Sequence, residues 1–199
     1  MFCSISKVLV LVSVFSLSAA FADVAPVSTG KITGRVTSMP PKFLADTVVF
    51  IKNVPGNYEA RTLIMDQQKM SFIPRVLAVT ARDTVQFWNH DSMMHDVFSS
   101  DNEKYNLGSI KTGENRPYTF AKEGSYAQLC HFHPEMIAYV FVGQNPFSVV
   151  VDSTGNYSLE NVPAGTYEVA TWNPKLKSSG SPVTVTVGQE AKANFSIHR

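Results

Sequence analysis

Cysteine is scarce in this chain of 199 residues, which has only Cys3 and Cys130. Cys3 precedes the apolar run VLVLVSVFSLSAAF, and the small-x-small tripeptide AFA follows at residues 20–22. We interpret residues 1–22 as a secretory signal peptide, because the apolar run is short for a membrane anchor, which is the alternative. The mature chain then keeps one thiol, which excludes an internal disulfide and must be buried or occupied in an oxidising compartment.

The sequence also lacks an imbalance of charge. Its 17 basic and 16 acidic residues leave a formal net charge of +1. This balance gives no electrostatic reason to expect nucleic acid or an anionic membrane as a partner. Together with the predicted signal peptide, it leads us to expect a periplasmic or secreted protein that is not an integral membrane protein.

Helical periodicity is missing as well. No long window repeats apolar residues at 3.6-residue spacing, whereas period-2 runs are common, as in VTVTV at 183–187 and again over 191–197. Turn sequences separate the runs, such as DSTGN at 152–156 and VPAG at 162–165. Many short strands with frequent turns predict an all-β fold of the sandwich or barrel type.

The chain has two regions of different composition, and residues 144–199 form the one rich in valine, threonine, glycine and proline. Their stretch VDSTGNYSLENVPAGTYEVATW resembles the carboxypeptidase regulatory-like family of small β-sandwich domains. In that family an I-x-G-x-V strand and a second apolar strand come first, and ITGRV at 32–36 and TVVFI at 47–51 match them. The resemblance favours one sandwich built from residues 30–54 and 144–199, with a domain at 63–143 inserted. The alternative is a tandem of residues 30–143 and 144–199.

The chemistry is concentrated in CHFHPEM at residues 130–136. A thiolate, imidazole nitrogens and a weak thioether are the ligands of type 1 copper, which Cys130, His133 and Met136 would supply together with His95 upstream. His131 follows Cys130 directly, so a continuing strand would turn its side chain to the opposite face. We therefore expect His131 to face the surface or a partner.

Residues from about 73 to 142 resemble the cupredoxin family, which includes plastocyanin, pseudoazurin and amicyanin. The matching pieces are VLAV at 76–79, DTVQFWN at 83–89, Asp91, His95, and GSY at 124–126 leading into CHFHPEM. The whole layout also resembles bacterial proteins described as methylamine utilization or plastocyanin-like.

The cupredoxin resemblance implies a Greek-key β-sandwich that holds one copper ion per chain through four ligands, His95, Cys130, His133 and Met136. It also implies that His133 lies near the surface as the exit for an electron. Asp96 departs from the family, which usually has asparagine there, and an ionised carboxylate at that place would lower the reduction potential.

Several other residues are predicted not to be ligands. His90 lies in a turn and His198 at the chain end, so both are expected to be solvent-exposed, and Glu135 is expected to be solvated. Met93 and Met94 are expected to pack as apolar side chains at the rim of the site.

Catalysis is not expected from this sequence. The residue before Cys130 is Leu129, whereas a His-Cys-His run links the type 1 and trinuclear centres of multicopper oxidases. Too few histidines remain for more copper ions, and no nucleophile motif is present. The leading hypothesis is a carrier of single electrons between partners such as a c-type cytochrome and a dehydrogenase. The alternatives are a copper chaperone or storage protein, suggested by the methionines near His95, and a structural β-protein with a vestigial site.

Overall fold

The computed structural model describes residues 28–199, so the predicted signal peptide lies outside the described residues. The all-β prediction is confirmed, with one short 3₁₀ helix, η1 (Pro41–Asp46), as an addition. The strands of the described residues are β1 (Thr29–Met39), β2 (Val48–Ile51), β3 (Thr62–Gln68), β4 (Ser71–Ile73), β5 (Val76–Thr80), β6 (Thr84–Asn89), β7 (His95–Ser99), β8 (Tyr105–Ile110), β9 (Asn115–Thr119), β10 (Gly124–Leu129), β11 (Ile137–Gly143), β12 (Ser148–Val150), β13 (Asn156–Pro163), β14 (Gly165–Trp172), β15 (Gly180–Val185), β16 (Glu190–Lys192) and β17 (Phe195–His198).

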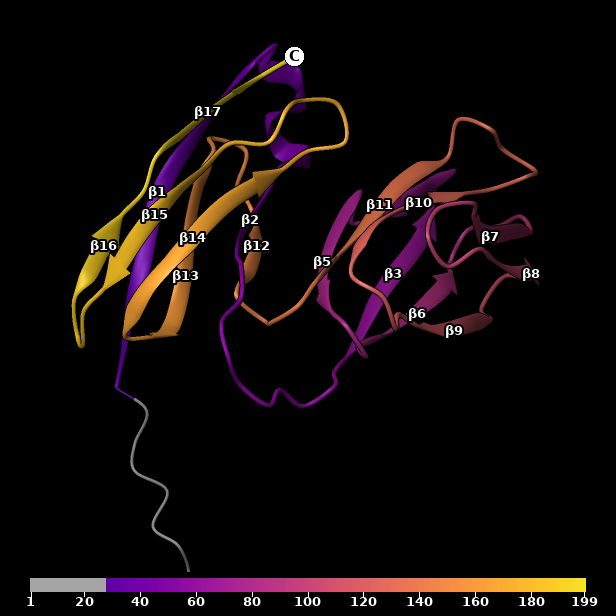
Figure 1. Ribbon diagram of the computed structural model, residues 1–199. Coiled ribbons are helices and arrows are strands. Elements are labelled where there is room, and N and C mark those ends of the chain that lie inside the picture. The colour runs from indigo at the N-terminus through magenta and orange to yellow at the C-terminus, as the bar shows by residue number, and fades with distance from the viewer. Residues whose placement is uncertain (1–27) are drawn as a thin grey trace, which may run out of the picture.

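The first two strands pair with the last six rather than with their neighbours in sequence. One sheet has the order β13-β1-β16, with β17 also on β1, and the other has the order β12-β2-β14-β15. Ile32 and Val36 of β1 are fully buried between these sheets, with Tyr167 packed against the same core. We call this unit, made of β1, η1, β2 and β12 to β17, the outer half (Figure 1).

Strands β3 to β11 form a second sandwich, which we call the central half. Its sheets have the orders β5-β11-β10-β7-β8 and β4-β3-β6-β9. Their inward faces bury large side chains such as Phe87, Phe120 and Tyr126, all with no exposed surface. This core also contains Cys130 and Met136, so the sandwich places two of the predicted ligands in its interior.

The strand expected over residues 191–197 is interrupted. It forms β16 and β17 on either side of Ala193 and Asn194, and both pieces run parallel to β1. The Asn194 side-chain oxygen accepts a hydrogen bond from the N–H of Arg35, 2.8 Å away, which replaces a regular pairing bond. A Cβ added to Gly34 would lie 1.7 Å from the Ala193 carbonyl oxygen, so only glycine permits this close approach of the two backbones.

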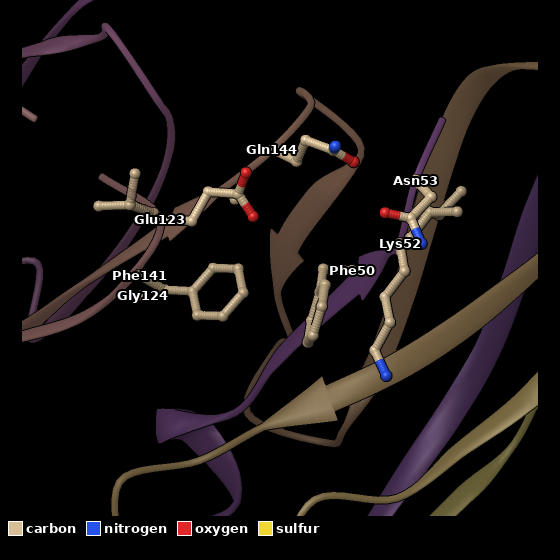
Figure 2. Close-up of a pocket in the computed structure, with 10 residues that line it drawn as sticks. Phe50, Lys52, Asn53, Glu123, Gly124, Phe141 and Gln144 are labelled. Atoms are coloured by element: carbon tan, nitrogen blue, oxygen red, sulfur yellow. The ribbon is translucent and has the colours of Figure 1, made fainter. Parts of the chain in front are cut away.

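The two halves meet through one sheet of each. Phe50 of β2 and Phe141 of β11 face each other with ring centroids 4.7 Å apart, and Trp172 of β14 lies 5.6 Å from the Phe141 ring. A cavity of about 370 Å³ opens at this junction beside Phe50, Phe141, Lys52 and Glu123 (Figure 2). The contact is therefore apolar at its centre and charged at its rim.

The helical content of residues 28–199 is limited to η1. No helix there has the length and apolar character needed to cross a bilayer.

Candidate metal centre

Three of the predicted ligands lie at the adjacent ends of two strands of the central half and in the loop that follows one of them. His95 is the first residue of β7, and Cys130 directly follows the last residue of β10. These strands are antiparallel neighbours, with Leu129 opposite Phe98, so the start of β7 and the end of β10 lie at the same end of the sheet. His133 lies in the loop that connects Cys130 to β11. Because β11 is the antiparallel neighbour of β10, this loop stays at the same end of the sheet as His95 and Cys130.

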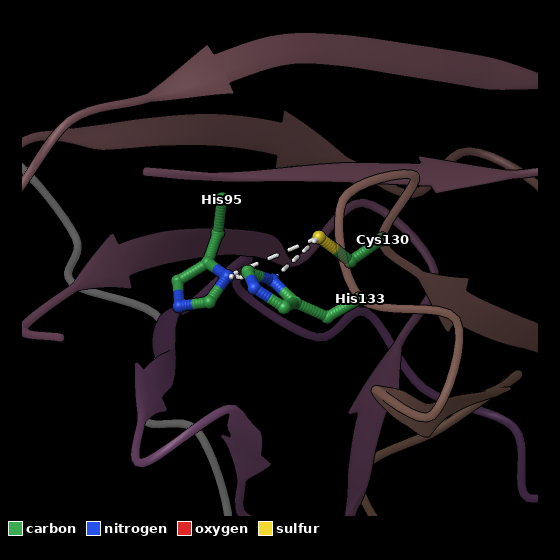
Figure 3. A group of neighbouring side chains, drawn as sticks. All are labelled: His95, Cys130 and His133. Atoms are coloured by element: carbon green, nitrogen blue, oxygen red, sulfur yellow. Dashed lines mark hydrogen bonds between the residues drawn. The ribbon is translucent and has the colours of Figure 1, made fainter. Parts of the chain in front are cut away.

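The donor atoms of these three residues converge. The Cys130 sulfur lies 3.9 Å from Nδ1 of His95 and 4.0 Å from Nδ1 of His133, and the two Nδ1 atoms are 3.0 Å apart. Figure 3 shows both rings directed toward the sulfur. His95 is fully buried and Cys130 is 3% exposed, whereas His133 is half-buried. Among residues 28–199 this is the group of histidine, cysteine and acidic side chains whose spacing suits a metal ion.

The spacing fits a small soft cation. In zinc sites, metal bonds are about 2.0 Å long to histidine nitrogen and about 2.3 Å long to thiolate sulfur. Donors on different sides of one ion are then separated by about 3 to 4 Å, which is the range seen for all three pairs. Two imidazole nitrogens and one thiolate also bind copper in preference to hard cations such as calcium, which prefer oxygen ligands.

A carboxylate fixes the orientation of the His95 ring. Nε2 of His95 lies 3.1 Å from a carboxylate oxygen of Asp91, whose side chain is 12% exposed. A proton on Nε2 satisfies this contact and leaves the lone pair of Nδ1 facing the Cys130 sulfur. The N–H of Met70 and then the His95 ring hold the pKa of Asp91 below its usual range, so the carboxylate stays charged.

Asn89 shapes the loop that presents His95, a role that was not predicted from the sequence, although Asn89-His90-Asp91 was expected to form a turn. Its side-chain amide donates to the carbonyls of Met93 and Ile110, both at 2.8 Å, and its oxygen accepts from the N–H of Asp91 at 2.9 Å. The side chain is fully buried. An asparagine followed by His-Asp at a strand end was the available signal, because such residues bond their own turn.

Asp96 joins the two ligand-bearing segments. Its carboxylate accepts from the backbone N–H of His131 at 2.7 Å and contacts Nδ1 of the same residue at 2.5 Å. Asp96 is 5% exposed, whereas the His131 side chain is 55% exposed and stacks on Phe98. His131 is thus at the surface, but the reason given from strand alternation was wrong, because β10 ends at Leu129. The Asp96 carboxylate orients it instead.

The thiol of Cys130 is in a mixed environment. Burial raises its pKa, whereas the backbone N–H groups of Asp96 and His133 act in the opposite direction by favouring the thiolate. A metal ion binds the thiolate, so binding must release this proton. The N–H groups stay in place afterwards and stabilise the charge on sulfur.

Met136 lies under the same loop. It is 1% exposed, belongs to the core cluster that contains Cys130, and its N–H donates to the carbonyl of His133 at 2.9 Å. This hydrogen bond closes the segment His133-Pro134-Glu135-Met136 into a turn. The turn keeps Met136 in the interior while the half-buried His133 stays nearer the surface.

The remaining candidates lie outside the cluster. His90, Glu135 and His198 are exposed, and His90 is bonded to Asp66 at 2.8 Å. Met93 and Met94 were expected to pack at the rim, yet they are 39% and 44% exposed. Their loop is held by Asn89 through the Met93 backbone, so their side chains can remain in solvent.

Comparison with protein families gives two matches that meet at residue 143. Residues 59–143 match the family described as copper binding proteins, plastocyanin/azurin family, and residues 143–193 match the one described as polysaccharide lyase family 4, domain II. The second description differs from the carboxypeptidase regulatory-like family expected from the sequence, so only a β-domain is supported there. None of the curated proteins compared with the chain matches it.

Among solved structures, similar chains include a purple cupredoxin from Nitrosopumilus maritimus, with 24% identity, a TM-score of 0.39, and coverage of 41% of this chain and 99% of that one. A mutant of amicyanin in the reduced state has 29% identity and a TM-score of 0.38, over 41% of this chain and 81% of that one. A copper-containing nitrite reductase from Thermus scotoductus has 25% identity and a TM-score of 0.41, over 48% of this chain but only 25% of that one.

Proposed function

We propose that this protein is a periplasmic or secreted type 1 copper protein that carries single electrons between redox partners. His95, Cys130, His133 and Met136 would hold one copper ion, which would supply a one-electron couple when bound. The observation that carries the proposal is the convergence of one thiol and two imidazole Nδ1 atoms, all within 4.8 Å of one another, at one end of a β-sandwich. The match of residues 59–143 to a copper-binding family supports it.

The surroundings of the donors favour a carrier over an enzyme. The donors are attached to strands and a short hydrogen-bonded turn, and Asp91 and Asp96 fix the flanking segments. Such a site can keep its geometry when the charge of the ion changes, which electron transfer requires. Met136, buried in the same core cluster as Cys130, would as a fourth ligand occupy a position that a substrate otherwise needs.

The surface near His133 is suited to a redox partner. Phe132, next in sequence to His133, is 47% exposed, and Met93 and Met94 beside His95 in sequence are also exposed. We propose that a partner such as a c-type cytochrome or a dehydrogenase contacts this apolar surface, because it would approach the half-buried His133 ring there.

The second candidate function is copper transfer or storage. Exposed methionines favour it, because thioethers bind Cu(I) and the side chains of Met93 and Met94 are accessible to a donor or acceptor protein. This role needs copper release, whereas the carrier role needs copper retention through repeated oxidation and reduction.

We propose the following domain division: residues 30–54 and 144–199 form one β-sandwich and residues 63–143 the copper domain. The pairing of β1 with β13 and of β2 with β14 supports it.

The experiment is to load the mature protein with one equivalent of Cu(II) and to record the visible spectrum of wild type and of Cys130→Ser. We expect an intense thiolate-to-copper charge-transfer band in wild type that is absent from Cys130→Ser. No such band in folded, copper-loaded wild type would overturn the type 1 assignment.

Voltammetry then separates the two candidates. A reversible couple without loss of copper supports the carrier. Release of Cu(I) to a competing protein, with no reversible couple, supports the chaperone.

A further inference from the structure

Strand β11 leads directly from the metal site into the junction between the halves. It begins at Ile137, one residue after Met136. Ala138 and Val140 face the core of the central half, whereas Tyr139 and Phe141 belong to the junction cluster. This alternation follows from the two-residue period of a strand. The segment that carries Met136 is thus in contact with both halves.

Arg75 forms two hydrogen bonds to the first residues of β11. Its carbonyl accepts the N–H of Tyr139 at 2.9 Å, and its guanidinium donates to the carbonyl of Ile137 at 3.2 Å. The same guanidinium faces Asp46 of the outer half, with Nε 3.2 Å from each carboxylate oxygen. Asp46, Arg75 and Ile137 therefore connect the outer half to the residue next to Met136. We call this connection the Asp46–Arg75 bridge.

The outer-half end of the bridge is firmly held. Asp46 is the last residue of η1 and its side chain is 10% exposed. The side-chain amide of Asn173, itself 7% exposed, donates to the carbonyl of Phe43 at 2.8 Å and to the hydroxyl of Thr47 at 2.9 Å. These bonds attach η1 to the end of β14. They restrain the backbone on both sides of Asp46.

The side chains around Met136 do not fill the space beside it completely. A cavity of about 150 Å³ is lined by Phe72, Arg75, Met136 and their neighbours. Side chains next to such a space lose contacts on that side and can adopt other rotamers. The position of Met136 therefore depends on how its backbone is anchored at Ile137, which is where the bridge ends.

We propose that the outer half positions Met136 in the metal site through the Asp46–Arg75 bridge. Asp46 and Arg75 are positioning residues, because they act on the thioether through the backbone of β11. The inference deepens the proposed copper function and rests on it. It would give the outer half a role in setting how closely the Met136 thioether approaches bound copper, and hence the reduction potential.

The test compares Asp46→Asn with a matched control, Asp83→Asn, in the full mature chain. Asp83 also pairs a buried carboxylate with a partly exposed arginine, with its side chain 1% exposed and 2.7 Å from Arg61, but its hydrogen bonds go to Arg61 and Thr80 and not to β11. We expect Asp46→Asn to change the ratio of the charge-transfer bands and the reduction potential. Asp83→Asn should lower the melting temperature and leave both unchanged.

Amide hydrogen exchange of the copper-free protein gives an independent readout. In Asp46→Asn the Tyr139 amide should exchange about ten-fold faster, the change expected for loss of one charge-assisted hydrogen bond. Arg75→Lys should act in the same direction, because one ammonium group cannot reproduce the fork of contacts to Asp46 and Ile137.

The outcomes are distinct. If wild type shows a charge-transfer band but Asp46→Asn has wild-type spectrum, potential and exchange, the bridge has no positioning role and the inference is wrong. If wild type shows no band, the copper proposal fails, while faster exchange at Tyr139 would still establish the mechanical connection.

Discussion

The central and outer halves are both β-sandwiches with apolar cores, yet they differ in what else they bury. The outer half buries mainly valine, isoleucine and aromatic side chains around Ile32 and Val36. The central half buries an imidazole, a thiol and an amide near one end, which belong to His95, Cys130 and Asn89. Burial of polar groups destabilises a fold unless each finds a partner. The donor cluster can therefore exist only because dedicated partners surround it.

Those partners have specific tasks. Asp91 selects the nitrogen of His95 that faces the thiol, Asn89 fixes the loop, and Asp96 ties the β7 segment to His131. In the outer half the comparable constraint is steric, where Gly34 lets β1 approach residue 193. The donor cluster of the central half is therefore held by polar contacts, whereas the outer half, which also buries Thr47 and Asn173, is constrained at β1 by close packing.

Gly34→Ala, which changes the close-packed contact of the outer half, should have the largest effect on stability. The new methyl group would meet the Ala193 backbone at 1.7 Å, and a rigid carbonyl cannot move aside. We expect a loss near the upper end of about 1–3 kcal/mol in unfolding free energy, which lowers the melting temperature by roughly 6–12 °C. Calorimetry checks the loss, and the visible spectrum at room temperature should not change.

Gly56→Ala is the control for this substitution. The three atoms nearest to its methyl group would all belong to the phenol of Tyr58, the far end of a side chain that can rotate away. A Gly34→Ala protein as stable as Gly56→Ala would show that β1 does not pack in the outer half as described.

A smaller effect, confined to the central half, is expected from Asp91→Asn. Loss of the charge facing His95 should weaken copper binding about ten- to a hundred-fold, about 1.4–2.7 kcal/mol, as for other partners of metal-bound histidines. A competition titration against a copper chelator measures it.

Asp66→Asn is the matched control, because Asp66 bonds His90, which lies outside the cluster. Equal affinities for Asp91→Asn and Asp66→Asn would mean that Asp91 does not orient His95.

Much of this arrangement could be predicted from the sequence. The period-2 run at 183–187 overlaps β15, the cupredoxin resemblance marked the strands that become β6 and β10, and the spacing in CHFHPEM indicated that Cys130 and His133 gather near His95. The break between β16 and β17 was missed, because it depends on a backbone approach at Gly34 that alternation cannot reveal. The contact of Asp96 with His131 and that of Arg75 with Asp46 were missed because they join residues 29 to 35 positions apart.

One thiolate and two imidazoles should hold a single copper ion in a geometry that does not depend on the charge of the ion. X-ray absorption at the copper edge, recorded on the oxidised and the reduced protein, tests this most directly. We predict one sulfur and two nitrogens at short distance in both states, with nearly unchanged bond lengths. A shell without sulfur, or a ligand number that changes on reduction, would contradict this arrangement.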